Sequence, residues 1–262
     1  MPADVHDSTA TTRLTFPGAT GARLVANLTE PTGGQVSGCA VFAHCFTCSK
    51  DLKAAVRISR ELARLGIAVL RFDFTGIGES AGDFADTNFS SNVEDLLAAA
   101  RFLADVRQAP SLAVGHSLGG AAVLQAAGRL DAVSAVATIG APYDPAHVAH
   151  LFAAAEPTIR AAGEAEVLLA GRRFRITRQF LDDLEAVRVD DRLAQLQRAL
   201  LVMHSPVDTI VGIENAERLY RAAKHPKSFV SLDSADHLLT RDDDARYAAR
   251  VLAAWASRYT AA

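Results

Sequence analysis

Short apolar runs alternate with longer helical patterns through the first half of the chain. The runs that read as strands are 38–43, 67–72, 111–114 and 133–139. The helical patterns between them are 52–65, 93–106 and 118–127. Apolar residues occupy consecutive positions in the strands, which is typical of strands covered by helices on both faces. This repeated strand–helix–strand order predicts a buried parallel sheet with right-handed crossovers.

Further strands are expected at both ends of this core. The segments Arg13 to Phe16 and Arg23 to Leu28 are separated by the turn-rich stretch 17–21, which predicts two antiparallel leading strands. Near the other end, runs at 199–203 and 229–232 resume the alternation, with a helical pattern between them. The sheet should therefore be mixed but mostly parallel.

Residues 142–197 break the pattern, because charged residues become dense there and the alternation stops. The stretch predicts short helices near 145–154 and 177–187, and a hairpin around Gly171. An insertion after a strand lies over the edge where open α/β sheets bind ligands. We therefore expect one α/β domain over residues 1–262, with 142–197 forming a small cap insertion.

The composition of the chain argues against nucleic acid and membranes as partners. Half of the 262 residues are hydrophobic and 22% are charged, which suffices for a single folded domain. The 27 basic and 30 acidic residues leave no basic excess for nucleic acid. No apolar run reaches the ~18 residues of a membrane span, and the first residues do not resemble a signal peptide. We expect a soluble, unexported, cytoplasmic protein, and the sequence leaves its oligomeric state open.

The three cysteines, Cys39, Cys45 and Cys48, lie close together, which fits a reducing compartment better than a disulfide scaffold. Cys45 and Cys48 match CxxC, but a zinc site would need further ligands, of which His44 could supply one. A thioredoxin-like motif normally opens a helix in a smaller fold. We expect an unremarkable pair of small residues in a loop, and no metal or cofactor.

The segment Gly115-His116-Ser117-Leu118-Gly119 follows a predicted strand and precedes a predicted helix. GxSxG in this context forms a strained turn that presents a nucleophilic serine at the head of the helix, while the glycines let strand and helix approach. A serine hydroxyl needs a base to take its proton. Ser117 is therefore the candidate nucleophile.

The acid and the base should follow Ser117 in that order, each in a loop after a strand. Asp208 follows the strand 199–203, and His237 follows the strand 229–232. Asp208 would accept from His237 Nδ1–H, while Nε2 takes the serine proton. Asp236 is the alternative acid, but its side chain diverges from that of its neighbour His237.

We expect the other histidines to have structural rather than catalytic roles. Three lie near strand ends, where loop-shaping hydrogen bonds are expected: His44, His116 and His204. Four are expected at the surface or in the cap: His6, His147, His150 and His225.

Acyl transfer also needs hydrogen-bond donors for the oxyanion. In this arrangement one donor is the backbone N–H of the residue after the nucleophile, here Leu118. The other comes from the loop after the strand 38–43, and we assign it to the N–H of Phe46.

Two other motifs give weaker evidence for a binding site. The glycine-rich stretch 73–80 lacks GxGxxG and a P-loop lysine, so a sharp turn is expected there rather than a phosphate site. Four arginines of the cap could attract a carboxylate or form a solvated basic face, and we expect the latter. They are Arg172, Arg173, Arg175 and Arg178.

Together these residues resemble the α/β-hydrolase superfamily over nearly the whole chain. More narrowly, the segments Ala43–Asp51, Arg71–Ser80 and Asn88–Asn92 are similar to the hydrolase half of proteins fused to an OsmC-like domain. The resemblance implies the α/β-hydrolase fold and a serine hydrolase that needs no cofactor, with Ser117, Asp208 and His237 as its triad. The chain stops just after its final predicted helix, so we expect no OsmC-like half and none of its peroxide-reducing activity.

The expected function is a carboxylesterase that hydrolyses small to medium acyl esters through an acyl-Ser117 intermediate. The same triad would serve a thioesterase, a lactonase or an amidase, and the sequence does not separate these. Epoxide and haloalkane hydrolysis are disfavoured, because on this fold they use a carboxylate where Ser117 stands. A binding module for a separate OsmC-like protein is the non-enzymatic alternative, which an intact triad argues against.

Overall fold

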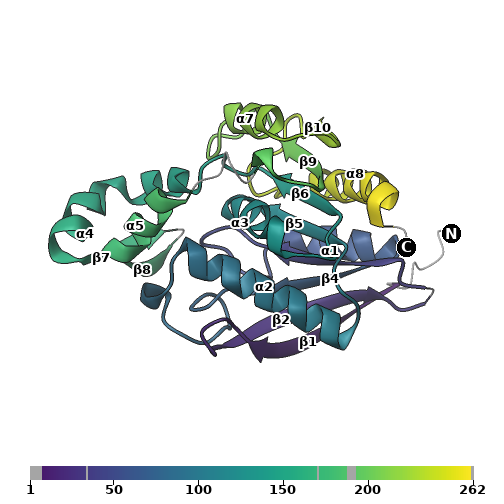
Figure 1. Cartoon of the computed structure of the whole chain (residues 1–262), viewed down its shortest axis with the longest axis horizontal. Helices are drawn as coiled ribbons and strands as arrows, with labels where there is room; N and C mark the ends of the chain where they lie inside the picture. Colours follow the sequence, from purple (N-terminus) through teal and green to yellow (C-terminus); the bar gives the residue numbers. More distant parts are fainter. Residues whose placement is uncertain (1–7, 34, 170, 188–192, 261–262) are drawn as a thin grey trace.

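The computed structural model describes residues 8–33, 35–169, 171–187 and 193–260. Within them a central sheet carries helices on both faces, and a smaller group of elements projects from one end (Figure 1). The ends of the predicted domain, 1–7 with His6 and 261–262, lie outside the described residues, as do 170 and 188–192 of the predicted cap.

The central sheet has the order β1-β2-β4-β3-β5-β6-β9-β10. Its strands are β1 Thr9–Pro17, β2 Arg23–Pro31, β3 Gly38–Ala43, β4 Ile67–Phe72, β5 Leu112–His116, β6 Ala135–Ile139, β9 Ala199–His204 and β10 Lys227–Ser231. β1 pairs antiparallel with β2, and β2 with β4, while every pair from β4 to β10 is parallel. The predicted mixed, mostly parallel sheet is confirmed.

Helices cover the two faces of this sheet. They are α1 Lys53–Arg64, α2 Phe89–Val106, α3 Leu118–Ala126, α7 Glu214–Ala222 and α8 Asp242–Thr260, with short 3-10 turns η1 Phe84–Asp86 and η2 Ala127–Arg129. In β3, Cys39 and Val41 join the core on the side of α2 and α3, whereas Ala40 and Phe42 join the core with α1 and α8. Consecutive apolar residues thus fill both cores, as the unbroken apolar runs predict.

The helix α2 begins at Phe89, four residues before the predicted start near Val93. Asn88 accepts a hydrogen bond from the Ser91 N–H, and Ser91 Oγ accepts one from the Asn88 N–H. This capping box satisfies N–H groups that have no partner within the helix. The Asn-x-x-Ser spacing was the available signal for the earlier start.

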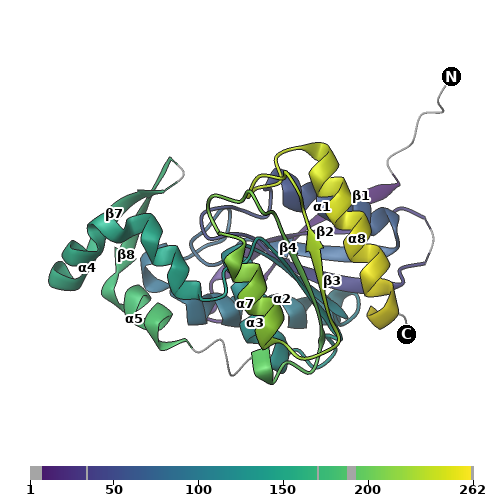
Figure 2. The same ribbon diagram turned by 90° about the horizontal axis from the view of Figure 1, so that it is seen from above.

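The segment between β6 and β9 holds η3 Pro145–Ala155, α4 Glu156–Ala162, the antiparallel pair β7 Glu164–Leu169 and β8 Arg172–Thr177, and α5 Arg178–Ala186. These elements lie together at one end of the molecule in both views, away from the start of β1 and the end of α8 (Figures 1 and 2). Gln179 and Asp183 of α5 bond the N-terminal end of α2 through Asn88 and Ser90. Those bonds fix one side of the segment to the sheet domain.

Candidate active site

Ser117 occupies the sharp turn between β5 and α3, where its φ of 54° and ψ of −126° are unusual for a residue with a side chain. The Ser117 N–H donates to Ile139 O across 2.9 Å, and the Gly120 N–H donates to Ser117 O across 2.8 Å. The flanking elements therefore hold a conformation that costs free energy by itself. Strain of this kind collects at functional positions.

Two glycines make the turn sterically feasible. A Cβ on Gly115 would collide with the backbone of Gly119, and a Cβ on Gly119 would collide with the carbonyl oxygens of Ala43 and His44. The strand β5, the helix α3 and the end of β3 therefore meet closely around Ser117. This contact sets the position of the serine relative to the loop after β3.

The structure brings Asp208 and His237 together from separate strand ends. His237 Nδ1 donates to Asp208 Oδ2 across 2.7 Å, and Oδ1 accepts from the N–H groups of Ile210 and Val211, each at 2.9 Å. Burial alone would raise the pKa of the Asp208 carboxyl, but the bonds from His237 and the two amides hold that pKa below its ordinary value. Asp208 is therefore ionised, and it fixes the His237 proton on Nδ1.

Asp236, the alternative acid, faces another partner. Its carboxylate accepts from the Leu238 N–H across 2.9 Å, and from the N–H and hydroxyl of Thr240. It caps its own loop rather than orienting the imidazole of its neighbour. Asp208 is the carboxylate that bonds the candidate base.

Ser117 and His237 line one cavity of about 280 Å³. Its wall is mainly apolar and draws on the segment 142–197, which contributes Pro142, His147, Val148, His150, Leu151 and Leu169. Pockets for small ligands are usually of this kind, with a few polar groups on an apolar wall. His147 and His150, expected only as surface or cap residues, thus face the cavity from η3.

Phe46 and Leu118 line the same cavity. Leu118 is the first residue of α3, where a backbone N–H has no acceptor within the helix. Phe46 is the second residue of a turn closed by a hydrogen bond from the Cys48 N–H to Cys45 O, and that turn does not use the Phe46 N–H. Neither amide is used by its own turn or helix, which is compatible with the predicted role of the two N–H groups as oxyanion donors.

The Phe46 ring is held by an aromatic cluster. Its centroid lies 5.6 Å from that of Phe84 and 5.5 Å from that of Phe180, and Phe152 and Phe174 lie 6.4 Å away. Phe152, Phe174 and Phe180 belong to the segment between β6 and β9. The loop after β3 is therefore packed against that segment.

Three buried histidines each bond the backbone of one active-site loop, as predicted. His44 Nδ1 bonds Cys45 O, His116 Nε2 bonds His237 O and His204 Nε2 bonds Val211 O, each across 2.7 Å. Because a carbonyl only accepts, the bonded nitrogen of each ring carries the proton. The loops carrying the candidate oxyanion donor, base and acid are each tied by one imidazole.

Burial keeps these rings neutral. It lowers the pKa values of His44 and His204, and it lowers the pKa of His116 to about 3, with the nearby His237 adding to the effect. A neutral ring can donate one hydrogen bond at neutral pH without placing a second positive charge beside His237.

A buried ion cluster, which the sequence did not reveal, fixes the far end of the loop after β3. Lys50 Nζ bonds Asp73 Oδ2 across 3.0 Å and also reaches Asp51 and Glu79, while the Lys50 N–H donates to Asp73 Oδ1. The Lys50 and Asp73 side chains are only 1% and 0% exposed. This cluster explains the stretch 73–80 as a sharp turn around Asp73 instead of a phosphate site. The sequence places Asp73 directly after β4 and Lys50 in the loop after β3, but it does not indicate that the two side chains pair.

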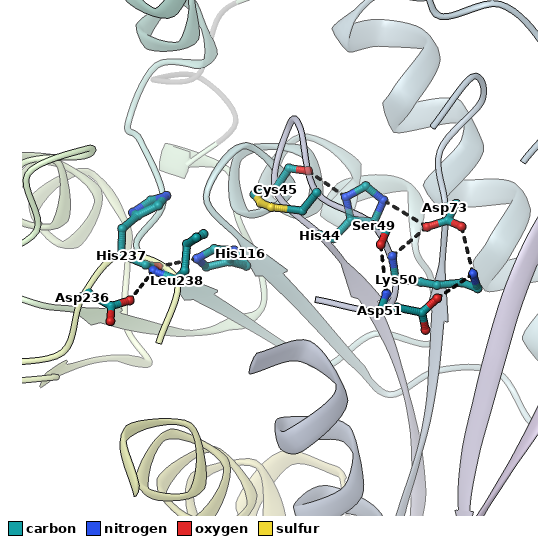
Figure 3. The surroundings of a disulfide bond; sticks show 11 residues. His44, Cys45, Ser49, Lys50, Asp51, Asp73, His116, Asp236, His237 and Leu238 are labelled. Carbon is teal, nitrogen blue, oxygen red and sulfur yellow. Dashed lines mark hydrogen bonds and ion pairs between the residues drawn. A yellow bond between two sulfur atoms is a disulfide. The ribbon is translucent and has the colours of Figure 1, made fainter. Parts of the chain in front are cut away.

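Cys45 and Cys48 form a disulfide, so the interpretation of an unremarkable pair is wrong. Figure 3 shows Cys45 between His237 and the Lys50–Asp73 pair. Cys39 is a buried free thiol in β3. The clustered spacing that argued against a disulfide scaffold did not exclude one bond across a single turn.

Other groups do not enter the site. Arg173 pairs with Glu166, Arg175 with Asp83, and Arg178 donates to Arg160 O, all at the surface, which agrees with a solvated basic face. Across the described ranges, no three His, Cys, Asp or Glu side chains form a group that could hold a metal ion. None of the described helices has the length and apolar character needed to cross a bilayer.

Comparison with known proteins agrees with this architecture. A model described as the Alpha/beta hydrolase family matches residues 40–259. The esterase domain of a Rhodothermus marinus protein is 53% identical in sequence and covers 96% of this chain and 99% of its own, with a TM-score of 0.78. These matches confirm the predicted α/β-hydrolase fold.

More distant relatives carry other names. The rat palmitoyl-protein thioesterase ABHD10, mitochondrial, from Rattus norvegicus, is 33% identical over 87 residues, which are 33% of this chain and 28% of that relative. The solved structure of the mouse protein of that name has a TM-score of 0.77 at 21% identity, covering 94% of this chain and 99% of that chain, which shows the fold alone. None of these names refers to an OsmC-like domain, so that narrower resemblance stays a prediction.

Proposed function

Because the chain belongs to the alpha/beta hydrolase family, we propose that it is a serine-dependent carboxylesterase with Ser117 as nucleophile, His237 as base and Asp208 as acid. The observation that carries the proposal is the 2.7 Å bond between His237 Nδ1 and Asp208 Oδ2, made beside the cavity that Ser117 also lines. The 53% identical esterase domain supports an ester substrate.

In the proposed reaction His237 Nε2 takes the proton of Ser117 Oγ, and the oxygen attacks the ester carbonyl carbon. Asp208 holds the ring in the tautomer that leaves Nε2 free, and it stabilises the imidazolium that forms. The negative oxygen of the tetrahedral intermediate accepts from the N–H groups of Phe46 and Leu118. His237 then protonates the leaving alcohol, and a water molecule activated by the same ring hydrolyses the acyl-serine.

The cavity supports acyl groups of small to medium size. Its volume of about 280 Å³ lies just below the range for small-molecule pockets, roughly 300–1,000 Å³. Val148, Leu151 and Leu169 give it an apolar wall suited to an alkyl chain, and none of the described residues that line it is a Lys or an Arg. A neutral ester fits this lining better than an acid with a second carboxylate.

A thioester is the second candidate substrate, because curated relatives over part of the chain are named palmitoyl-protein thioesterases. The chemistry at Ser117 is the same for both bonds, so only the leaving group differs. A palmitoyl chain is long for a cavity of this volume. We therefore place short acyl esters ahead of long acyl thioesters.

The test compares the wild type with Ser117→Ala and His237→Ala on p-nitrophenyl acetate, butyrate and decanoate, and on acyl-CoA thioesters of matching length. We expect hydrolysis of the short esters by the wild type and a loss of roughly 10⁴-fold or more in kcat for both variants. Circular dichroism and thermal unfolding of the variants control for loss of fold.

Labelling with a fluorophosphonate probe tests the nucleophile directly. An adduct should form on Ser117 of the wild type and be absent in Ser117→Ala. A folded wild-type protein without an adduct and without hydrolysis would support a non-catalytic binding module instead. Higher kcat/KM for the thioester than for the matched ester would reassign the substrate while keeping the triad.

A further inference from the structure

The Cys45–Cys48 disulfide closes the turn that contains Phe46, whose N–H is a proposed oxyanion donor. Both cysteines line that cavity together with Ser117 and His237. The disulfide is thus part of the wall of the candidate active site, and it encloses one of its two proposed oxyanion donors. A covalent bond in this position bears directly on the geometry of that donor.

The two ends of the loop after β3 are buried and hydrogen-bonded, whereas the residues in its middle are more exposed. His44 is 2% exposed and bonds Cys45 O, and Lys50 is 1% exposed within its ion cluster. Between them Thr47, Cys48 and Ser49 are half-exposed. The hydrogen bond that closes the turn, from the Cys48 N–H to Cys45 O, measures 3.2 Å, at the long end of the normal range. The disulfide is the stronger of the two closures.

We propose that Cys45 and Cys48 form a redox-active site that exchanges with a dithiol, and that the oxidised pair supports fast ester hydrolysis while the reduced pair slows it. This proposal rests on the esterase function proposed above. It assigns to the CxxC sequence a role in controlling the oxyanion site rather than in binding a metal.

The exchange follows ordinary thiol–disulfide chemistry. A thiolate of the dithiol attacks Sγ of Cys48, which is the more exposed of the two cysteines. The bond between the two protein sulfurs breaks, and Cys45 leaves as a thiolate and takes a proton from water. The second thiol of the reductant then attacks the mixed disulfide and releases Cys48. Two electrons and two protons pass to the protein, and the dithiol becomes its own disulfide; a small-molecule disulfide reverses the reaction.

Reduction acts on the Phe46 N–H through the peptide that joins Cys45 to Phe46. The Phe46 ring stays anchored beside Phe84 and Phe180, but the orientation of that peptide depends on closure of the turn. Loss of one oxyanion donor costs roughly 10²–10³-fold in kcat. A displaced donor retains part of its effect, so we expect reduction to lower kcat by about tenfold or more.

Cys39 provides an internal control. It lies in β3 with no exposed surface, and burial raises the pKa of its thiol to about 11, so little reactive thiolate forms there. A dithiol effect that arises at the turn should not depend on it.

The experiment uses the whole chain in a series of buffers with different ratios of reduced to oxidised dithiothreitol. Each sample is divided: one part is assayed for p-nitrophenyl butyrate hydrolysis and for the rate of fluorophosphonate labelling at Ser117. The other is quenched with iodoacetamide, and alkylation at Cys45 and Cys48 is measured by mass spectrometry. We expect both rates to fall together with the fraction of the pair that is oxidised.

Variants separate the redox site from other effects. Cys45→Ser/Cys48→Ser should show the low rate of the reduced wild type in every buffer, and Cys39→Ala should keep the full response. A hydrolysis rate that stays constant while the pair becomes alkylated would overturn the proposal, as would free thiols at both positions in the oxidised buffers. Absence of ester hydrolysis in every buffer would instead reject the esterase function.

Discussion

His116 donates its Nε2 proton to the backbone carbonyl oxygen of His237 across 2.7 Å. The residue that precedes the candidate nucleophile thus holds the loop of the candidate base. The two ring centroids lie 5.0 Å apart, but only His237 lines the cavity, and burial lowers the pKa of His116 to about 3, which keeps that ring neutral. His116 acts as a positioning residue for His237.

Replacing His116 tests this positioning. His116→Phe removes the donor and leaves a buried carbonyl without a partner, so we expect a loss of about 1–3 kcal/mol in the free energy of unfolding and about tenfold in kcat. KM should change little, because His116 does not line the cavity. His116→Gln, which can still donate, should recover most of the kcat; equal losses in the two variants would argue against a positioning hydrogen bond.

The neutral buried state of His116 also predicts how stability depends on pH. Its pKa is about 3 in the folded protein and about 6.5 in the unfolded chain, so below pH 6.5 the unfolded state binds a proton that the native state does not. Stability should therefore fall as pH drops from 6.5 toward 3. Between pH 7.5 and pH 5, His116 alone should account for about 2 kcal/mol of that decrease.

Urea unfolding of the wild type and His116→Phe at these two pH values measures the contribution of His116. The difference between the two pH values should be smaller in the variant. An identical difference in both proteins would mean that His116 is protonated in the native state at pH 5.

Asp208 and Asp236 form a matched pair for identifying the acid. Asp208→Asn removes the charge that stabilises the imidazolium and allows the wrong tautomer, so we expect kcat to fall by roughly 10⁴-fold. Asp236→Asn changes a carboxylate that caps its own loop, and kcat should stay within about twofold of the wild type. A larger loss in Asp236→Asn than in Asp208→Asn would reverse the assignment.

The buried lysine offers a test of stability. Lys50→Met leaves the buried Asp73 side chain without its cationic partner, so we expect the free energy of unfolding to fall by about 3–5 kcal/mol. Glu79→Gln changes an exposed member of the same cluster and should cost much less. Chemical denaturation of both variants distinguishes a buried structural cluster from a solvated one, for which the two losses would be similar.

Acyl-chain selectivity should depend on Val148, which is buried against the cavity. Val148→Phe adds volume to the wall and should lower kcat/KM for p-nitrophenyl butyrate relative to acetate by about tenfold. Val106→Phe, on the exposed end of α2, controls for added aromatic bulk. An unchanged butyrate-to-acetate ratio in Val148→Phe would place the acyl chain elsewhere.

Much of this architecture follows from local sequence patterns. Mostly apolar runs such as 38–43 and 67–72, the second interrupted by Arg71, predict buried strands, and the structure contains them with the same bounds. The Gly115–Gly119 motif predicts a strained serine turn, because only that backbone path brings strand and helix so close. Asp208 and His237 could be selected because the acid and the base of this motif follow the serine in that order, each in a loop after a strand.

Contacts between distant segments could not be predicted in the same way. Nothing near Lys50 indicates that Asp73 and Glu79 fold around it, because the pairing depends on how two loops at neighbouring strand ends cross. The Cys45–Cys48 bond was missed because spacing alone does not tell whether two thiols meet. His147 and His150 lie in the segment 142–197, as expected, but the sequence did not predict that they line the cavity, because the side of η3 that faces it depends on how that segment docks.

The aromatic cluster around Phe46 links substrate entry to transition-state stabilisation. Phe152, Phe174 and Phe180 belong to the segment that supplies part of the cavity wall, while Phe46 carries a proposed oxyanion donor on its backbone. An acyl group that displaces these three phenylalanines would therefore also displace Phe46 and its backbone N–H, the proposed donor to the oxyanion. A variant with a larger pocket would therefore need further aromatic substitutions that keep Phe46 in place. Without them, it would accept longer acyl groups but hydrolyse them with a lower kcat.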